Sequence, residues 1–548
     1  MKRRLITLIT AAALVLSLLA ACGGNSNKSG SSAGNNDSSA AGSSQQKEDN
    51  SPSTPTGEPV YGGILRATTN SDATTLDALV ATSADDQVPA THIFETALFP
   101  DASGAVWPGV CNYTFENNIL TLTVREGVTF HNGDPVTIDD IYASAQRWLL
   151  LSSAAKKQVA PMMDSMEVVD GALVITFNEV APLALLAISG YDGGMYIFPA
   201  SICEKYGENP IPEGADLIGT GPYKFVEHRA DQFVLVERYD GYVPTENEGA
   251  TGFAAPKMAY CDQIYFYPVA DKTTRITGVQ TGEYDVGIGV PANMIAEIDA
   301  DPNLVLVTSD LGTMACAIFN NQSGPCTDIN LRNAMLACLD MDELMLAAQG
   351  DASLYRLNPC YMMTSSQWFT DESLGKYNAP DLEKAKEYLA ASSYDGEELV
   401  FVTTTAYDYF YNTAILFEQM VEQIGIKVDV QVYDNATLKE YRSDPTKFDI
   451  FSGGLTAKDD PTQIAFMDET WAGFWSNEKK DELLEIMTTT MDFDTRYDAW
   501  VELQKLLYEE VPNINFGERI NPIVTQKNVH NLFETTQKYY WNTWKDAE

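Results

Sequence analysis

The stretch Thr123–Ile141, TVREGVTFHNGDPVTIDDI, carries the local patterns that decide the fold. It begins within the β-type run Ile119–Val124, which predicts a strand. Gly127 and Gly133 then mark turns, because glycine reaches positive φ angles without steric cost. Pro135–Asp140 is typical of a helix start, since acidic side chains are favoured at the positive end of the helix dipole. The stretch therefore predicts a strand, tight turns and a helix in close succession.

The same alternation of strand and helix patterns continues on both sides of this stretch. Strands are expected at 63–68, 119–124, 173–177, 233–238, 263–269, 399–404, 427–433 and 448–452. Helices are expected at 137–151, 272–281, 329–338, 381–391, 410–424, 479–489 and 494–509, with Asp328 as an N-cap. This order predicts an α/β architecture.

Composition excludes several classes of protein. The chain has 548 residues, with 35 basic against 77 acidic side chains, a net charge of −42 and a pI near 4.3. Nucleic acid is not an expected partner, because binding a polyphosphate requires a basic surface. A length of this size allows about three or four structural units, and 45% hydrophobic residues can supply their cores.

The N-terminus has the pattern of an exported lipoprotein. Residues 1–21 are expected to be a signal peptide, with basic Lys2–Arg4 followed by an apolar run that is short for a membrane span. Leu19–Cys22 resembles a lipobox, which makes Cys22 the expected lipidation site and the new N-terminus. The alternative is an ordinary signal peptide. Residues 22–58 are then expected to be the lipidated cysteine and a flexible linker rich in Gly, Ser and Asn.

Four sequence blocks, in order along the chain, carry a resemblance to a known family. Gly62–Arg66 with Thr75–Asp77 resembles a first strand and a TLDP turn, with Ala78 in place of the proline. Thr123–Ile141 is similar to the signature LR-GVKFHDG-P-TA-DV. Ile218–Phe225 contains the GTGPY block, and Asp271–Asp285 resembles the D-R-A-Q-GE-D helix. These blocks resemble the extracellular solute-binding proteins of family 5, which include oligopeptide-, dipeptide- and nickel-binding components of ABC importers.

The resemblance implies a two-lobed periplasmic-binding-protein fold of type II, cluster C, with a hinge between the lobes. The N-terminal lobe would comprise 59–309 and 516–548, with an extra subdomain at about 89–186, and the second lobe 310–515. A ligand that contacts both lobes would stabilise their closure. The resemblance also implies no enzymatic activity, delivery of the solute to permease subunits, and a monomer.

The resemblance also points to a binding segment in the second lobe. Peptide-binding members carry a GWSADYPDP segment whose first Asp anchors the α-amino group of the peptide. Placed by its terminal Asp-Pro, the segment puts Ala457 at that Asp and Gly454 at the Trp. The candidate ligand-binding residues are Tyr407, Tyr409, Leu455, Thr456, Ala457, Lys458, Asp459 and Trp471. Asp459 could replace the missing carboxylate if the loop shifts, or it could form a turn with Asp460.

Aromatic clusters offer walls for the same site. They are Tyr407–Tyr411 after one strand and Trp471–Trp475 downstream of the segment, and either cluster could be core or cleft. Lys458 could meet a carboxylate or remain solvated.

Other chemistry finds little support in the sequence. The four histidines are dispersed, and His131 is expected to be a turn residue and not a ligand or base. No Cys-x-x-Cys pair occurs, so no metal site or cofactor is expected. After Cys22 seven cysteines remain, and their pairing cannot be deduced. No motif for a nucleophile or phosphate loop occurs.

Together these observations predict a lipid-anchored receptor on the extracytoplasmic face of the cell membrane. It would capture a peptide or peptide-like solute for an ABC importer. An oligosaccharide, nickel, a metallophore or another non-peptide solute is the alternative, and a secreted enzyme is a remote one.

Overall fold

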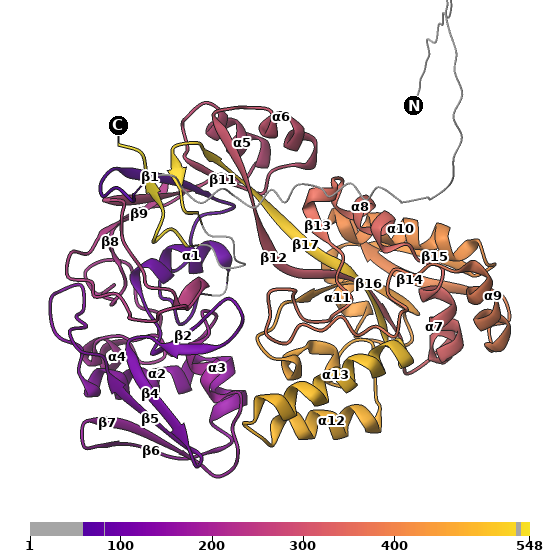
Figure 1. Ribbon diagram of the computed structural model, residues 1–548, viewed down its shortest axis with the longest axis horizontal. Coiled ribbons are helices and arrows are strands. Elements are labelled where there is room, and N and C mark those ends of the chain that lie inside the picture. The colour runs from indigo at the N-terminus through magenta and orange to yellow at the C-terminus, as the bar shows by residue number, and fades with distance from the viewer. Residues whose placement is uncertain (1–57, 82, 533–538, 548) are drawn as a thin grey trace, which may run out of the picture. The chain divides into compact units, whose positions relative to one another are not determined.

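The computed structural model describes residues 58–81, 83–532 and 539–547. The expected signal peptide, Cys22 and all but the last residue of the linker lie outside the described residues. Helices and strands alternate along the described chain, which has the expected α/β character (Figure 1). Within the described part no helix combines the length and the apolar character needed to cross a bilayer.

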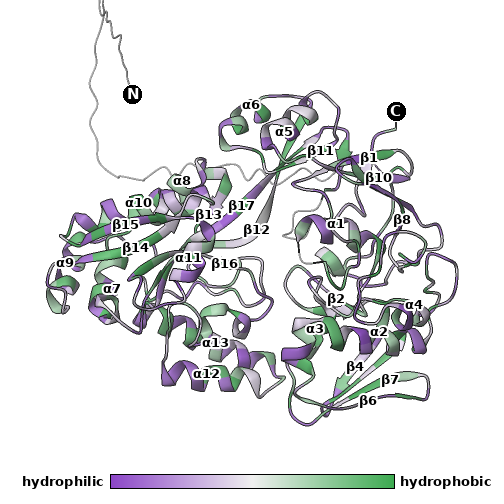
Figure 2. Cartoon of the chain, turned by 180° about the vertical axis from the view of Figure 1, so that it is seen from behind, coloured by the Kyte–Doolittle hydropathy of each residue, from purple (hydrophilic) through white to green (hydrophobic). Residues whose placement is uncertain are grey.

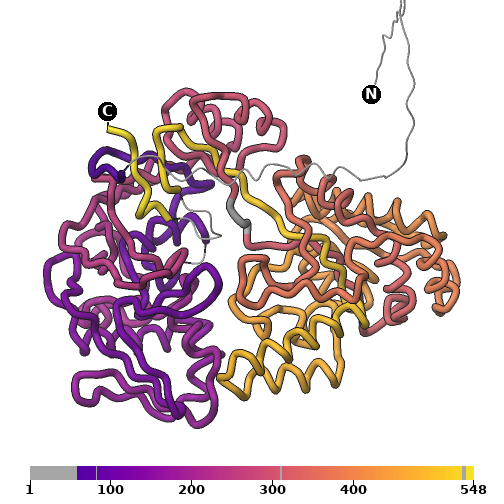
Figure 3. The backbone as a smooth tube through the Cα atoms, in the orientation of Figure 1, coloured from indigo at the N-terminus to yellow at the C-terminus, as the bar shows by residue number. Residues whose placement is uncertain are grey.

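Two long antiparallel strands, β12 (Leu304–Phe319) and β17 (Asn513–Gln526), connect the two lobes. Their pairing runs from Leu304 opposite Gln526 to Ile318 opposite Asn513, with register shifts after Asp310 and Ala315. One end of β17 pairs with β11 (Val286–Ile288) of the first lobe. Its middle, at Glu518 and Arg519, pairs with β13 (Tyr355–Arg356) of the second lobe. The two strands therefore form the hinge, and Figure 3 shows the chain after β17 returning to the first lobe.

The first lobe is built on one side of this hinge. Its part of the large sheet has the strand order β17-β11-β1-β10-β9-β8. The first-lobe strands of this sheet, besides β11, are β1 (Ile64–Thr69), β8 (Tyr223–Arg229), β9 (Phe233–Arg238) and β10 (Gln263–Pro268). A separate two-stranded sheet consists of β18 (Val529–His530) and β19 (Trp544–Lys545). Its helices are α1 (Ala84–Ile93), α2 (Ile138–Leu151), α3 (Ala184–Ser189), α4 (Ala200–Tyr206), α5 (Lys272–Gln280) and α6 (Ile295–Asp299).

Smaller sheets complete the first lobe. A four-stranded sheet has the order β4-β5-β7-β6, and β2 pairs with β3. These strands are β2 (Leu98–Pro100), β3 (Val106–Pro108), β4 (Cys111–Glu116), β5 (Ile119–Val124), β6 (Met163–Val169) and β7 (Ala172–Phe177). The lobe has short helical turns at η1 (Ala155–Val159), η2 (Gly252–Ala254) and η3 (Ala292–Met294).

The second lobe continues the large sheet with the order β15-β14-β16-β12. Its strands are β14 (Glu398–Thr404), β15 (Lys427–Tyr433) and β16 (Ile450–Thr456). Its helices are α7 (Ile329–Leu336), α8 (Met341–Gln349), α9 (Leu382–Ala391), α10 (Asp408–Glu422), α11 (Asn435–Tyr441), α12 (Glu478–Thr488) and α13 (Phe493–Glu510). Short turns are η4 (Pro325–Thr327), η5 (Ala352–Leu354), η6 (Pro461–Gln463) and η7 (Ala465–Met467).

Each lobe has its own hydrophobic core. One large cluster gathers buried residues from Leu65 to Ile288, with Ile523 and Trp541 from the returning chain. The other gathers residues from Met314 to Phe516. Figure 2 shows polar and apolar residues alternating along α12 and α13, as expected for helices that bury one face.

The signature stretch folds as predicted. The strand in this stretch ends at Val124. In the turns that follow, Gly127 has a φ of 80° and Gly133 a φ of 87°. Thr137 and Asp140 then form a capping box at the start of α2. His131 is confirmed as a structural residue. Its Nδ1 accepts a hydrogen bond from the Gly219 amide, and its Nε2 contacts the Gly221 carbonyl at 3.0 Å. Burial lowers the pKa of His131 to about 4, so the ring is neutral.

Two predicted boundaries were wrong in a way that affects the site. The strand expected to end at 452 runs on to Thr456, because β12 continues to pair with it there. The segment Gly453–Thr456 is therefore strand and not loop. The helix expected from 410 begins at Asp408, so Tyr409 belongs to its first turn.

Candidate functional site

A cavity of about 840 Å³ is lined by residues of both lobes. From the first lobe it receives the turns around Leu79, Ser103, Ser152, Asp192 and Phe253. From the second lobe it receives Met363, Ser365, Ser366, Thr456–Asp459 and Gln463. Because its walls come from the two bodies that the hinge joins, hinge motion opens or shuts this cavity.

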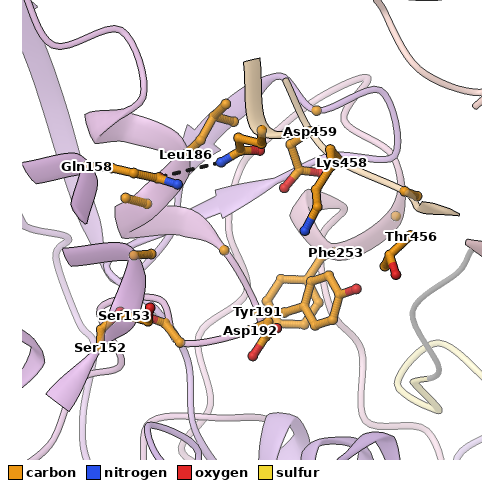
Figure 4. A pocket seen from close by; sticks show the side chains of 18 of the residues that line it. Ser152, Ser153, Gln158, Leu186, Tyr191, Asp192, Phe253, Thr456, Lys458 and Asp459 are labelled. Atoms are coloured by element: carbon orange, nitrogen blue, oxygen red, sulfur yellow. Dashed lines mark hydrogen bonds between the residues drawn. The ribbon is translucent and has the colours of Figure 1, made fainter. Parts of the chain in front are cut away.

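The lobes touch directly at the cavity rim. The amide of Gln367 donates a hydrogen bond of 3.0 Å to the Ser103 carbonyl. The Gln463 Nε2 donates to the Gln158 Oε1 at 3.4 Å, the dashed line in Figure 4. The Gln367 and Gln463 contacts tie second-lobe segments to two different parts of the first lobe.

The end of β16 brings the centre of the predicted segment to the cavity. Thr456, Ala457, Lys458 and Asp459 all line it, and the Ala457 amide donates to the Gly312 carbonyl in β12 at 2.7 Å. Figure 4 shows Lys458 and Asp459 reaching in from one lobe and Tyr191 and Phe253 from the other. A cation and an anion from adjacent positions therefore share the second-lobe wall.

Asp459 and Asp460 have different surroundings. Asp460 is completely buried, caps η6 through the Thr462 amide and hydroxyl, and forms an ion pair with Arg496. The Asp459 side chain accepts no hydrogen bond from the described residues, and its carbonyl binds the Trp368 indole N–H at 2.9 Å. The turn expected from both residues is thus made by Asp460, and Asp459 is left to face the cavity.

Enclosure between the lobes alters the acidity of the cavity groups. It raises the pKa of Asp459, an effect that the Lys458 ammonium opposes. Burial raises the pKa of Tyr191 to about 12, with the charges of Asp459 and Asp192 adding to the effect. The Tyr191 phenol is therefore neutral, and it can donate or accept a hydrogen bond.

A second, smaller cavity of about 220 Å³ shares Thr456 and Lys458 with the first. It is also lined by two more of the predicted residues, Leu455 and Trp471. Its remaining lining residues are Met314, Tyr361, Arg442, Gly454, Ile464 and Ala465. Trp475, from the same predicted aromatic cluster as Trp471, is buried in the core.

Tyr407 and Tyr409 line neither of these two cavities. Tyr409 lies under the Arg519 guanidinium, with 3.7 Å from Cζ to the ring centroid. Its hydroxyl lies 2.6 Å from the position that a Cβ would take at Gly454, and it therefore occupies the space of a side chain there. Tyr407 is 45% exposed and packs edge-on against Phe410.

Sequence reasoning missed the first-lobe wall. Tyr191, Phe253 and Gln158 lie in three separate loops and turns, and no periodic pattern marks them. The only local indication is the glycine content of Gly190–Gly194 and Gly252, which is typical of turns.

The described residues contain no cluster of three or more His, Cys, Asp or Glu side chains placed to hold a metal ion. The cysteines at 111, 203, 261, 316, 326, 338 and 360 are all buried and unpaired in the structure.

Two lobes, a two-stranded hinge and a shared cavity define a two-lobed solute-binding protein. The family model for bacterial extracellular solute-binding proteins, family 5 (middle), matches residues 115–478. The chain belongs to this family, whose members are substrate-binding proteins of ABC transporters and not enzymes.

Individual relatives agree with this assignment. A probable peptide ABC transporter periplasmic-binding protein of Sinorhizobium fredii is 26% identical over 86% of this chain and 91% of its own length. The periplasmic oligopeptide-binding protein of Salmonella typhimurium is 24% identical over 68% and 71% of the two chains. A solved ABC transporter substrate-binding protein of Listeria monocytogenes has the same fold, with a TM-score of 0.74, 19% identity, and coverage of 89% of this chain and all of the other.

Proposed function

We propose that this protein captures a peptide or peptide-like solute in the 840 Å³ cavity and delivers it to the permease subunits of an ABC importer. The observation that carries the proposal is the pair Lys458 and Asp459, which present opposite charges to the cavity from adjacent positions. A zwitterionic solute offers a matching ammonium and carboxylate. The names of the peptide-binding relatives support the same class of solute.

Asp459 is the proposed partner of a solute ammonium group. Its carboxylate lies in the cavity wall without a hydrogen-bond donor from the described residues. A cationic group placed there would stabilise the ionised carboxylate and lower its raised pKa. Ala457, at the position aligned with the amine-anchoring Asp, offers no charge. The GWSADYPDP motif can also be aligned with its first Gly at Gly454 and with one residue deleted before Asp460. In that alignment Lys458 takes the position of the amine-anchoring Asp. Both alignments therefore lack the usual carboxylate.

Solute capture is coupled to closure in this proposal. A ligand held by Asp459 on one lobe and by Tyr191 or Ser152 on the other favours the shut arrangement because it contacts both bodies. The direct contacts Ser103–Gln367 and Gln158–Gln463 add to that closure. The permease would then distinguish loaded from empty protein by the relation of its lobes.

The lipid anchor is also a proposal. Acylation at Cys22 would hold the protein on the extracytoplasmic face of the membrane, since two or more acyl chains give stable attachment. Replacing Cys22 by Ala in the full chain should move the protein from the membrane fraction to the soluble extracytoplasmic fraction. Retention of the variant in the membrane fraction would contradict the anchor.

The solute class is tested by thermal unfolding in the presence of defined di- to pentapeptides, oligosaccharides and nickel–chelate complexes. Peptides should raise the unfolding temperature, because a ligand that binds only the native state stabilises it. They should also be recovered chemically unchanged, which separates a binding protein from an enzyme. Stabilisation by a sugar or a metal complex, with none by peptides, would replace the peptide assignment.

A further inference from the structure

The 220 Å³ side cavity has a charge that is unusual for this protein. Its lining residues include two basic side chains, Arg442 and Lys458, and no aspartate or glutamate. The whole chain carries 77 acidic residues and 35 basic ones. A cavity with only positive charges is therefore the reverse of what the composition favours.

Arg442 is one of the two basic side chains that line this cavity. It follows the last residue of α11, and its guanidinium lies 5.8 Å from the Trp471 ring centroid and 6.0 Å from that of Phe451. Its guanidinium forms no hydrogen bond or ion pair with the described residues. Burial lowers the pKa of Arg442 without removing its charge.

The fully buried cations of the described chain have acceptors from the chain itself, either carboxylates or, at Arg275, backbone carbonyls. Lys257 lies 3.0 Å from Glu95, Lys545 lies 3.0 Å from Asp285, and Arg147 lies 2.6 Å from Asp77. A charged guanidinium forms stronger hydrogen bonds than a neutral donor does. A half-buried guanidinium that has no acceptor loses the stabilisation that these bonds would give. The Arg442 guanidinium meets no acceptor of the described chain, so its donors are open to water or to a solute in the cavity.

Lys458 connects this cavity to the main one. It lines both, as does Thr456, so a solute in the main cavity can extend one substituent past them towards Arg442. Asp459 lines the main cavity alone. The arrangement separates a site for positive charge from a site for negative charge along the same wall.

We infer that the side cavity is a carboxylate-binding subsite, in which Arg442 and Lys458 hold an acidic group of the solute. The inference rests on the proposed solute-binding function and narrows its substrate class to peptides or peptide-like solutes that carry a free carboxylate. The carboxylate can come from an acidic side chain or from the C-terminus, and the two sources are separable by experiment.

The test uses isothermal titration of the whole exported protein with matched tripeptides. One pair differs by Glu against Gln in a side chain, and the other by a free C-terminal acid against its amide. The acidic member of at least one pair should bind about tenfold or more tightly. The pair that shows the preference identifies the source of the carboxylate.

Arg442→Met retains the aliphatic packing and removes the charge. It should abolish the acid preference, by lowering the affinity for the acidic member to about that for the neutral member. Lys458→Gln should reduce the preference. Lys439→Met removes an exposed cation of α11 that lines neither cavity, and it should change nothing. An acid preference that survives in Arg442→Met, or its absence from the wild type, would overturn the subsite.

Glutarate and its diamide separate failure of the subsite from failure of the peptide assignment. Peptides that bind without an acid preference leave the proposed function standing and refute the subsite. If no peptide binds, stabilisation by glutarate that is lost in Arg442→Met supports the subsite and refutes the peptide assignment. If neither glutarate nor peptides bind, both proposals fail.

Discussion

Asp460 forms a buried ion pair with Arg496 of α13, and this pair fixes the turn that follows the cavity wall. The same carboxylate binds the amide and the hydroxyl of Thr462. With Asp460 held inside, the preceding Asp459 is directed to the cavity. The electrostatic character of the site thus depends on a residue that does not line it.

Breaking this ion pair should destabilise the second lobe strongly. Asp460→Asn leaves the Arg496 guanidinium buried without its counter-ion, a change that costs about 3–5 kcal/mol in comparable buried pairs. Urea unfolding should therefore show a large drop in the free energy of unfolding. Asp444→Asn is the matched control, because Asp444 makes the same contacts to the Thr446 amide and hydroxyl at an exposed turn without an arginine. Equal effects of the two substitutions would contradict the role of the ion pair.

Asp459 should lower stability at neutral pH in the unliganded protein. Burial raises its pKa in the folded state, so the native state holds the proton at pH values where the unfolded chain has released it. The protonated Asp459 side chain is the form that the folded state tolerates. Relative to neutral pH, the stability that it gives is complete below the unfolded pKa of about 3.9 and is lost as pH rises through the raised pKa of the folded state. Asp459→Asn should therefore unfold at a higher temperature than wild type at pH 7, with the difference shrinking towards pH 4. A difference that grows on acidification would contradict this assignment.

Gly454 should resist substitution because of Tyr409. A Cβ at position 454 would lie 2.6 Å from the Tyr409 hydroxyl, while the next atoms are 3.6 Å or more away. Gly454→Ala should cost about 1–3 kcal/mol, the usual range for overpacking. In a Tyr409→Phe background the cost should fall to a fraction of that value. A double-mutant cycle by denaturant unfolding checks this, and additive effects of the two substitutions would show that the residues do not interfere.

His228 should make stability fall as pH rises above 6.5. Burial opposes its charge, but hydrogen-bonding contacts to Asp72 at 2.9 Å and Glu213 at 2.6 Å prevail and raise its pKa. The contribution is complete below the unfolded pKa of about 6.5 and disappears as pH rises through the folded pKa. His228→Gln should remove this slope from the unfolding temperature. Glu227→Gln, beside it on β8, should leave the slope intact, and a slope that persists in His228→Gln would show that another group causes it.

The fold was predictable because its patterns are local. The β-type run over Ile119–Val124 and the helix start within Pro135–Asp140 depend on neighbouring residues, and both appear in the structure. The boundary of β16 was missed because its last residues are strand only through pairing with β12, a contact between segments far apart in sequence.

The candidate site was predictable on one lobe only. The family motif located Thr456–Asp459, which line the main cavity. The motif did not indicate Tyr191 or Arg442, because tertiary packing brings these residues to the cavities from other parts of the chain. Tyr407 and Tyr409 were chosen for their aromatic character, which also serves packing against Phe410 and Arg519.

The central claim is that the cavity between the lobes binds short peptides. It is tested most directly by unfolding the protein to remove bound material, refolding it, and exposing it to an equimolar pool of short peptides, oligosaccharides and metal chelates. Mass spectrometry then identifies what the desalted protein retains. The account predicts retained short peptides. Retention of a sugar or a metal chelate in their place, or of nothing, would contradict it.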